Sequence, residues 1–150
     1  MADQTLPSPP AVPLGGPIDQ FLAEPRNVMV AAIRKDGRPQ MTPNWFWWDG
    51  RRFYISTTKT RAKYRMFVRD PRVQLAIDDT TGFRSILVDG TVEIWEDIDL
   101  GLAHFRAIRA KHGRPPATDD ELRTTLRDEE RVLLVITPEK PAAAWRTIGF

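Results

Sequence analysis

Residues 56–65 of this chain read Ser-Thr-Thr-Lys-Thr-Arg-Ala-Lys-Tyr-Arg, and a strand pattern changes to a helix pattern within them. The short strand Arg52–Ile55 precedes the stretch, and the helix that it opens ends before Pro71. The hydroxyls of the first half can cap a helix, and Arg61 and Lys63 fall in its first turn. Free backbone N–H groups, the positive end of the helix dipole and two cations would then converge. The stretch therefore predicts a site for a phosphate or carboxylate group, with a capped surface helix bearing solvated basic residues as the alternative.

Two hairpins are predicted before this stretch. Val28–Ile33 is a continuous apolar run, typical of a buried strand, and Asp36-Gly37 is a turn signal after it. A single return strand is expected over Pro39–Trp48, and Asp49-Gly50 is a second turn signal that leads to the strand before residue 56. These patterns predict three consecutive antiparallel strands.

More strands and late helices are predicted after it. Gly90 interrupts the apolar face of one strand, which indicates a bulge or a close approach by a ligand or backbone. The fold class is mainly β, a small Greek-key barrel of about six antiparallel strands with accessory helices. The expected elements are strands over Arg72–Asp78, Arg84–Glu96 and Val132–Ile136, helices over Ile18–Ala23, Asp97–His112 and Thr118–Glu130, and an extended end over Ala142–Phe150.

Composition and charge narrow the function classes. The chain has 150 residues, 22 Lys and Arg, 20 Asp and Glu, and a net charge of +2, which argues against general nucleic-acid binding. Cysteine is absent, so thiolate catalysis and disulfides are excluded, and two histidines are too few for a His-rich metal site. No apolar run reaches the roughly 20 residues of a membrane span. We therefore expect a cytoplasmic protein without a metal site.

Domain organisation is predicted to be simple. Residues 1–17 are rich in Pro and Gly, which predicts a flexible or extended arm, and residues 18–150 are expected to form one domain. The block Trp45-Phe46-Trp47-Trp48 cannot face one core, because alternation sends two rings to each side of a strand. One pair would line a groove or a subunit interface, or else lie under the helices or the N-terminal arm. Asp78-Asp79 is interpreted as a strand-end turn.

No catalytic motif accompanies the anion site. The sequence has no nucleophile elbow, no Walker loop and no dinucleotide-binding glycine pattern. Solvated or helix-end roles are expected for His104 and His112. If the protein is an enzyme, its reactive group would come from a cofactor.

Four segments together resemble the split-barrel flavin-binding proteins of the pyridoxamine 5′-phosphate oxidase-like superfamily. They are Lys35–Gln40, Ser56–Arg65, Asp70–Val73 and Val88–Glu93. The resemblance is closest to the branch that binds the deazaflavin coenzyme F420, because Ala62 separates Arg61 from Lys63, whereas the oxidases typically have adjacent Arg and Lys. It implies a split β-barrel and a homodimer with cofactor sites at the subunit interface.

The resemblance also implies roles for individual residues. The cofactor phosphate would be bound by Ser56, Thr57, Thr60, Arg61 and Lys63, in a motif that includes Ala62 and Tyr64. The ring and side chain would be bordered by Thr42, Pro43, Asn44 and Trp45. Phe83, Arg84 and Ser85 match a segment that reaches cofactor across the dimer interface, and Trp145 would close the ring pocket.

The expected activity is hydride transfer from reduced F420 to an activated double bond of a small organic acceptor, with no dedicated protein acid. The alternatives are an FMN-binding oxidase or reductase, a carrier that binds flavin or haem without turnover, and a dimeric interaction module whose aromatic block is only an interface. RNA binding is not favoured, since aromatic residues are not interleaved with the Arg-rich helix.

Overall fold

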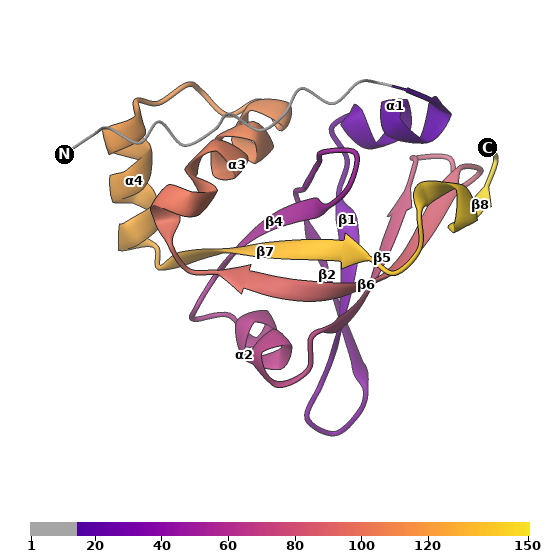
Figure 1. Cartoon of the computed structure of the whole chain (residues 1–150), viewed down its shortest axis with the longest axis horizontal. Coiled ribbons are helices and arrows are strands. Elements are labelled where there is room, and N and C mark those ends of the chain that lie inside the picture. The colour runs from indigo at the N-terminus through magenta and orange to yellow at the C-terminus, as the bar shows by residue number, and fades with distance from the viewer. Residues whose placement is uncertain (1–14) are drawn as a thin grey trace.

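The computed structural model describes residues 15–150, so the predicted arm, residues 1–17, lies almost entirely outside the described residues. One antiparallel sheet has the strand order β2-β1-β5-β6-β7-β4-β3, and β8 pairs with β6 (Figure 1). The strands are β1 (Val28–Ile33), β2 (Pro39–Asn44), β3 (Trp47–Trp48), β4 (Phe53–Thr58), β5 (Arg72–Asp78), β6 (Ser85–Trp95), β7 (Arg131–Pro138) and β8 (Arg146–Ile148). The helices are α1 (Pro17–Ala23), α2 (Ala62–Arg69), α3 (Ile98–Lys111), α4 (Asp119–Asp128) and the 3₁₀ turn η1 (Ala142–Ala144).

The sheet is curled into a split β-barrel. β2 and β3 stand at opposite ends of the strand order, yet Trp45 and Phe46 alone connect them. Two residues cannot span a flat sheet of this width, so the sheet has to curl until its two edges approach each other. The predicted single strand Pro39–Trp48 is therefore wrong, because the chain leaves one edge and joins the other within it. The predicted β-barrel with accessory helices is confirmed.

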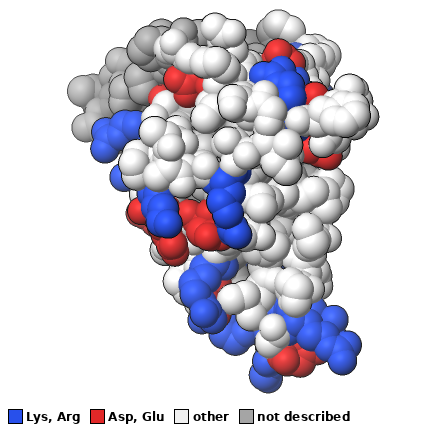
Figure 2. Space-filling model, turned by 90° about the vertical axis from the view of Figure 1, so that its right-hand side faces the viewer, with Lys and Arg blue, Asp and Glu red and all other residues white. Residues whose placement is uncertain are grey.

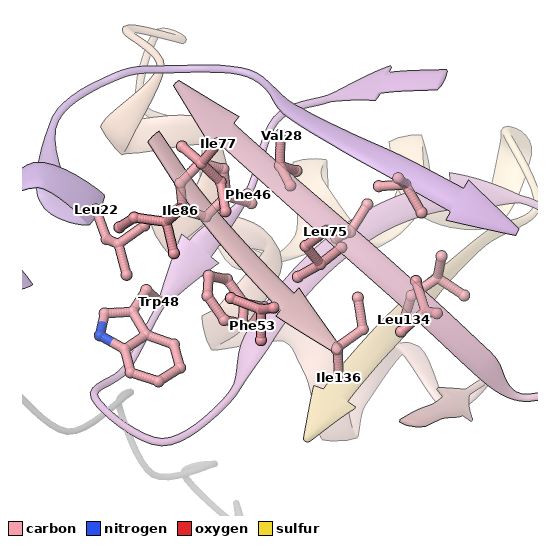
Figure 3. Packing of buried hydrophobic residues seen from close by; sticks show 14 of the residues in the cluster. Leu22, Val28, Phe46, Trp48, Phe53, Leu75, Ile77, Ile86, Leu134 and Ile136 are labelled. Carbon is pink, nitrogen blue, oxygen red and sulfur yellow. The ribbon is translucent and has the colours of Figure 1, made fainter. Parts of the chain in front are cut away.

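The inside of the barrel holds the main hydrophobic core. Alternating residues of β1, β5 and β6 face it, among them Val30, Leu75 and Ile86, each with no exposed surface. Figure 3 shows Phe46, Phe53 and Ile136 converging there from different parts of the chain. The aromatic block thus contributes Phe46 and Trp48 to the core, as expected for one of its two pairs.

A second core lies outside the barrel, where α3 and α4 cover β4 and β7. Leu102, Phe105 and Leu126 are almost fully buried between the helices and the sheet. α3 begins at Asp97, whose carboxylate accepts hydrogen bonds from the backbone N–H groups of the first turn. α4 begins with a capping box formed by Thr118 and Glu121. These two caps set where the helices begin.

Glycine at position 90 is required by the packing of β6 against β7. A Cβ atom there would lie 2.9 Å from the backbone oxygen of Thr137. This is the close backbone approach that the sequence predicts. None of the helices in residues 15–150 is long and apolar enough to cross a membrane.

Candidate functional site

A cavity of about 410 Å³ lies where the end of β2 and the middle of β4 meet the helix pair α3–α4. Six of the residues that the sequence singles out line it: Pro43, Asn44, Trp45, Ser56, Thr57 and Arg61. They come from three separate segments, which the curl of the sheet brings together. The structure therefore joins the predicted anion site and most of the predicted ring-binding segment in one cavity.

The hydroxyl of Thr57 is the least satisfied polar group in this wall. Thr57 is 1% exposed, and its Oγ1 atom has no hydrogen-bond partner among the described residues. A buried hydroxyl without a partner is costly, so such a group usually serves a ligand or water. Thr57 and Arg61 both line this cavity.

The start of α2 differs from the prediction in one respect. The residue before the first turn is Arg61, and no side chain caps the helix, whereas the sequence predicts a hydroxyl cap. The hydroxyls of Thr58 and Thr60 bond to each other instead, at 2.8 Å. Within the described residues, the first N–H groups of α2 thus lack a side-chain acceptor, and an anion could take that place.

Lys63 is buried, and its Nζ atom donates a hydrogen bond to Oδ1 of Asn44, which lines the cavity. The hydroxyl of Thr42 donates to the same oxygen at 3.3 Å. Burial, and secondarily the positive charge of Arg61, lowers the pKa of Lys63 to about 8. Asn44 therefore connects the predicted phosphate-binding lysine with the predicted ring-binding strand.

Trp45 forms an exposed wall of the cavity. Its ring is stacked on the imidazole of His112, with centroids 4.8 Å apart and planes 6° from parallel. Trp45 nevertheless keeps 42% of its surface exposed and lines the cavity. The second pair of the aromatic block is thus divided, because Trp47 packs against the core under the helices. His112 closes the end of α3, the helix-end role expected for it.

Other predicted residues lie around the cavity or away from it. Ala62 begins α2, and the hydroxyl of Tyr64 donates to Glu96 at 2.6 Å. Thr60 does not line the cavity. His104 is not solvated, because its ring packs against those of Tyr54, Trp47 and Trp95. Asp79 accepts hydrogen bonds from Thr81 and Gly82, which confirms the strand-end turn.

The segment Phe83–Ser85 and Trp145 do not line this cavity. Phe83 is 78% exposed, and the guanidinium of Arg84 lies over the rings of Phe21 and Phe150. Ser85 pairs with Asp78 and Ile148 in the sheet. Trp145 is packed on Trp48 and Phe53 in the main core, 9% exposed. Their predicted contacts with cofactor stay predictions, which for Phe83–Ser85 concern a partner subunit's site.

Sequence reasoning missed the wall formed by α3, α4 and the start of β7. This wall adds the basic residues Arg109, Arg114 and Arg131, one acid, Glu129, and the apolar residues Phe105, Ile108 and Leu126. The inward face of α3 was predictable from its period. The arginines carried no signal, because their position depends on how the helices dock on the sheet. No cluster of three or more His, Asp or Glu in residues 15–150 could hold a metal ion.

Comparison with known proteins identifies a protein family that matches most of this chain. A family pattern described as pyridoxamine 5′-phosphate oxidase matches residues 15–143. A solved structure described as F420 reductase is 28% identical, with a TM-score of 0.67, and the match covers 86% of this chain and 97% of the other. A conserved hypothetical protein of Mycobacterium tuberculosis is 24% identical (TM-score 0.73, 87% and 81% covered), and the haem storage protein HutZ of Vibrio cholerae is 17% identical (TM-score 0.71, 91% and 96% covered). The last two similarities show the shared fold.

Proposed function

The chain belongs to the pyridoxamine 5′-phosphate oxidase family, which includes oxidoreductases, and from this premise we propose that it is a coenzyme F420-dependent reductase. Its substrate would be a small organic acceptor with an activated double bond. The observation that carries the proposal is that Arg61 and Thr57, with its unpartnered hydroxyl, line one cavity together with Asn44, to which the buried Lys63 donates. The intervening Ala62 and the 28% identity to a protein described as F420 reductase support the deazaflavin branch.

The phosphate end of the cofactor is assigned to the strand-to-helix stretch. Arg61 supplies a guanidinium without an ion-pair partner in residues 15–150, and Thr57 supplies a buried hydroxyl. Lys63 and the free N–H groups at the start of α2 add to the positive potential at this stretch. A charged hydrogen bond of this kind contributes about 1.5–3 kcal/mol. Ser56 also lines the cavity and belongs to the proposed phosphate-binding set, whereas Thr60 lies outside the lining and its role rests on the resemblance alone.

The ring end is assigned to the segment that leaves β2. Thr42 and Lys63 both bond to Oδ1 of Asn44, so the Asn44 side chain is held in one orientation. Trp45, fixed by His112, would border the ring and exclude water from one side. When bound, reduced F420 supplies a hydride to the acceptor. The chain would position both partners, and solvent would supply the proton.

We propose that the protein is a homodimer. Cross-strand partners share one face of a sheet, and on the outer face this places together Met29, Ala31, Met41, Ala76 and Leu87. β2 contains no buried residue, and Met41 is 55% exposed. Figure 2 shows a broad area without charged side chains on one side of the molecule. In such a dimer, the resemblance implies that Phe83–Ser85 would reach the partner's cofactor.

An FMN-dependent enzyme is the second candidate, and the family membership favours it. A flavin or haem carrier is the third, suggested by the shared fold of HutZ. Neither His104 nor His112 lines the cavity formed by residues 15–150, so the haem carrier has less support here.

A titration of the apo-protein with F420 and with FMN tests the proposal. Tryptophan fluorescence is the readout, since Trp45 lines the cavity. We expect F420 to bind more tightly than FMN and Arg61→Gln to weaken F420 binding by at least about tenfold. Arg34→Gln, in the distant β1–β2 turn, is the matched control and should change nothing.

Tighter binding of FMN would favour the second candidate, an FMN-dependent enzyme. An unchanged Kd for F420 in Arg61→Gln would refute the proposed phosphate site. Oxidation of reduced F420 by added acceptors, followed by absorbance, then separates a reductase from a carrier.

A further inference from the structure

The helix side of the cavity carries a second group of positive charges. Arg109, Arg114 and Arg131 line it together with Arg61, against one carboxylate, Glu129. That carboxylate forms an ion pair with Arg131, whose Nε atom lies 2.7 Å from its Oε2 atom. Within residues 15–150, Arg109 and Arg114 have neither an ion-pair nor a hydrogen-bond partner for their side chains. Clustered cations in a cavity focus a positive potential on whatever enters it.

The backbone holds these two arginines near each other. Gly113 follows the end of α3. Its backbone lies in the left-handed region, with φ +75°, and reverses the direction of the chain. The backbone N–H of Arg114 then donates to the backbone oxygen of Arg109 at 2.9 Å. The two guanidiniums therefore start from adjoining backbone positions at the cavity rim. Arg131 is held as well, by Glu129 and by a 3.4 Å hydrogen bond to the hydroxyl of Ser56.

Apolar side chains also line the cavity, and Trp45 supplies an exposed ring among them. Phe105, Ile108 and Leu126 line the cavity and are each 2% exposed. Trp45 offers a flat ring whose other face is already covered by His112. A ligand that uses both features combines a planar apolar body with an acidic group.

We infer that the cavity contains a second subsite, formed by Arg109, Arg114 and Arg131, which binds the carboxylate or phosphate of a planar organic acid lying against Trp45. The inference rests on the proposed function for one point, the assignment of the Arg61 end to the cofactor phosphate. The acidic group could belong to the acceptor or to the far end of the cofactor, since both would present the same chemistry to the guanidiniums.

The test compares 2-naphthoate with its neutral analogue 2-naphthamide, by calorimetry on the apo-protein. We expect naphthoate to bind at least about tenfold more tightly, and the variant Arg109→Gln/Arg114→Gln to abolish that preference. Arg127→Gln, on the exposed side of α4, is the matched control and should retain it. Thermal melting of each variant verifies folding. Equal binding of the two probes, or an unchanged preference in the double variant, would overturn the inference.

Repeating the titration with saturating F420 identifies the source of the acidic group. Naphthoate that still binds assigns the subsite to the acceptor. Naphthoate displaced by F420, with weaker F420 binding in the double variant, assigns it to the cofactor. If F420 does not bind while naphthoate keeps its preference, the proposed function fails and the acid subsite stands.

Discussion

Lys63 is a lysine whose protonation is changed by burial. It is 5% exposed, it bonds to Asn44, and its pKa is lowered to about 8 by burial and by Arg61. An anionic ligand next to it would favour the protonated amine. Lys63 therefore links ligand binding to pH in a range where most lysines do not titrate.

Affinity for F420 should fall as the pH rises through about 8. Above this value the free protein holds Lys63 neutral, so binding has to take up a proton, and affinity then falls by up to about tenfold per pH unit. Titrations of wild type and Lys63→Met between pH 6.5 and about 9.5 test this. The variant should bind more weakly at the lower pH, with a flat profile. A wild-type affinity independent of pH would show that Lys63 does not face the anion.

At the residue scale, the sequence indicates the strand-to-helix side of the cavity better than the helix side. Residues 56–65 are contiguous, so their local pattern indicated Arg61 and Lys63 without tertiary information, whereas Thr57 was named from the family resemblance. Arg109 and Arg114 reach the same cavity only through the docking of α3 on the sheet, which no local pattern encodes.

At the element scale, Lys111 connects the end of α3 to two other segments of the chain. Its Nζ atom donates to the backbone oxygens of Leu22 (2.7 Å) and Phe46 (3.0 Å) and lies 3.5 Å from the Phe46 ring centroid. Three segments therefore meet at one buried amine: α3, the end of α1 and the β2–β3 link. Burial, with a smaller contribution from Arg26, lowers the pKa of Lys111 to about 7.

The free energy of unfolding should rise between about pH 7 and pH 10 because of Lys111. In that window the unfolded chain keeps the lysine protonated while the folded chain does not, so raising the pH favours the folded state. The slope from one group is at most about 1.4 kcal/mol per pH unit. Urea unfolding at several pH values measures it, and Lys111→Met should reduce the slope. Equal slopes in the two proteins would mean that the folded state keeps the amine charged.

Gly90→Ala should destabilise the β6–β7 pairing by about 1–3 kcal/mol, because the new methyl group would lie 2.9 Å from a backbone oxygen that cannot move independently. Chemical denaturation measures the loss. Gly16→Ala is the control, since a methyl group added there would meet no atom within 4 Å, and it should cost about 0.5 kcal/mol or less. Similar values for the two variants would contradict the role of the close approach.

The strands and helices whose apolar residues repeat with a clear period were predicted closely. β5 matches its predicted range, Arg72–Asp78, and α3 and α4 lie within the predicted ranges Asp97–His112 and Thr118–Glu130. The β2–β3 break was missed because aromatic residues continue the strand pattern through Trp45 and Phe46. What divides the strand is the closure of the barrel, a property of the whole sheet.

At the scale of the whole molecule, Met41→Glu should convert the proposed dimer into monomers. It places a charge on the outer sheet face, beside Ala31, where a second copy would bury it. Sedimentation velocity at micromolar concentration gives the state. Val68→Glu, at an equally exposed position on α2, should remain dimeric. A wild-type protein that is already monomeric would remove the proposed interface.

The pairing of β4 with β7 also constrains how the chain is made. β4 ends at Thr58, and β7, its neighbour on the inner side, begins at Arg131. During synthesis, an apolar strand thus leaves the ribosome long before its partner exists, with one edge open to other chains. We expect nascent chains to need protection from aggregation until residue 138 has emerged. Chains ended at residue 130 should accordingly sediment as aggregates, so the residues from 131 onward decide whether the first half of the chain can fold.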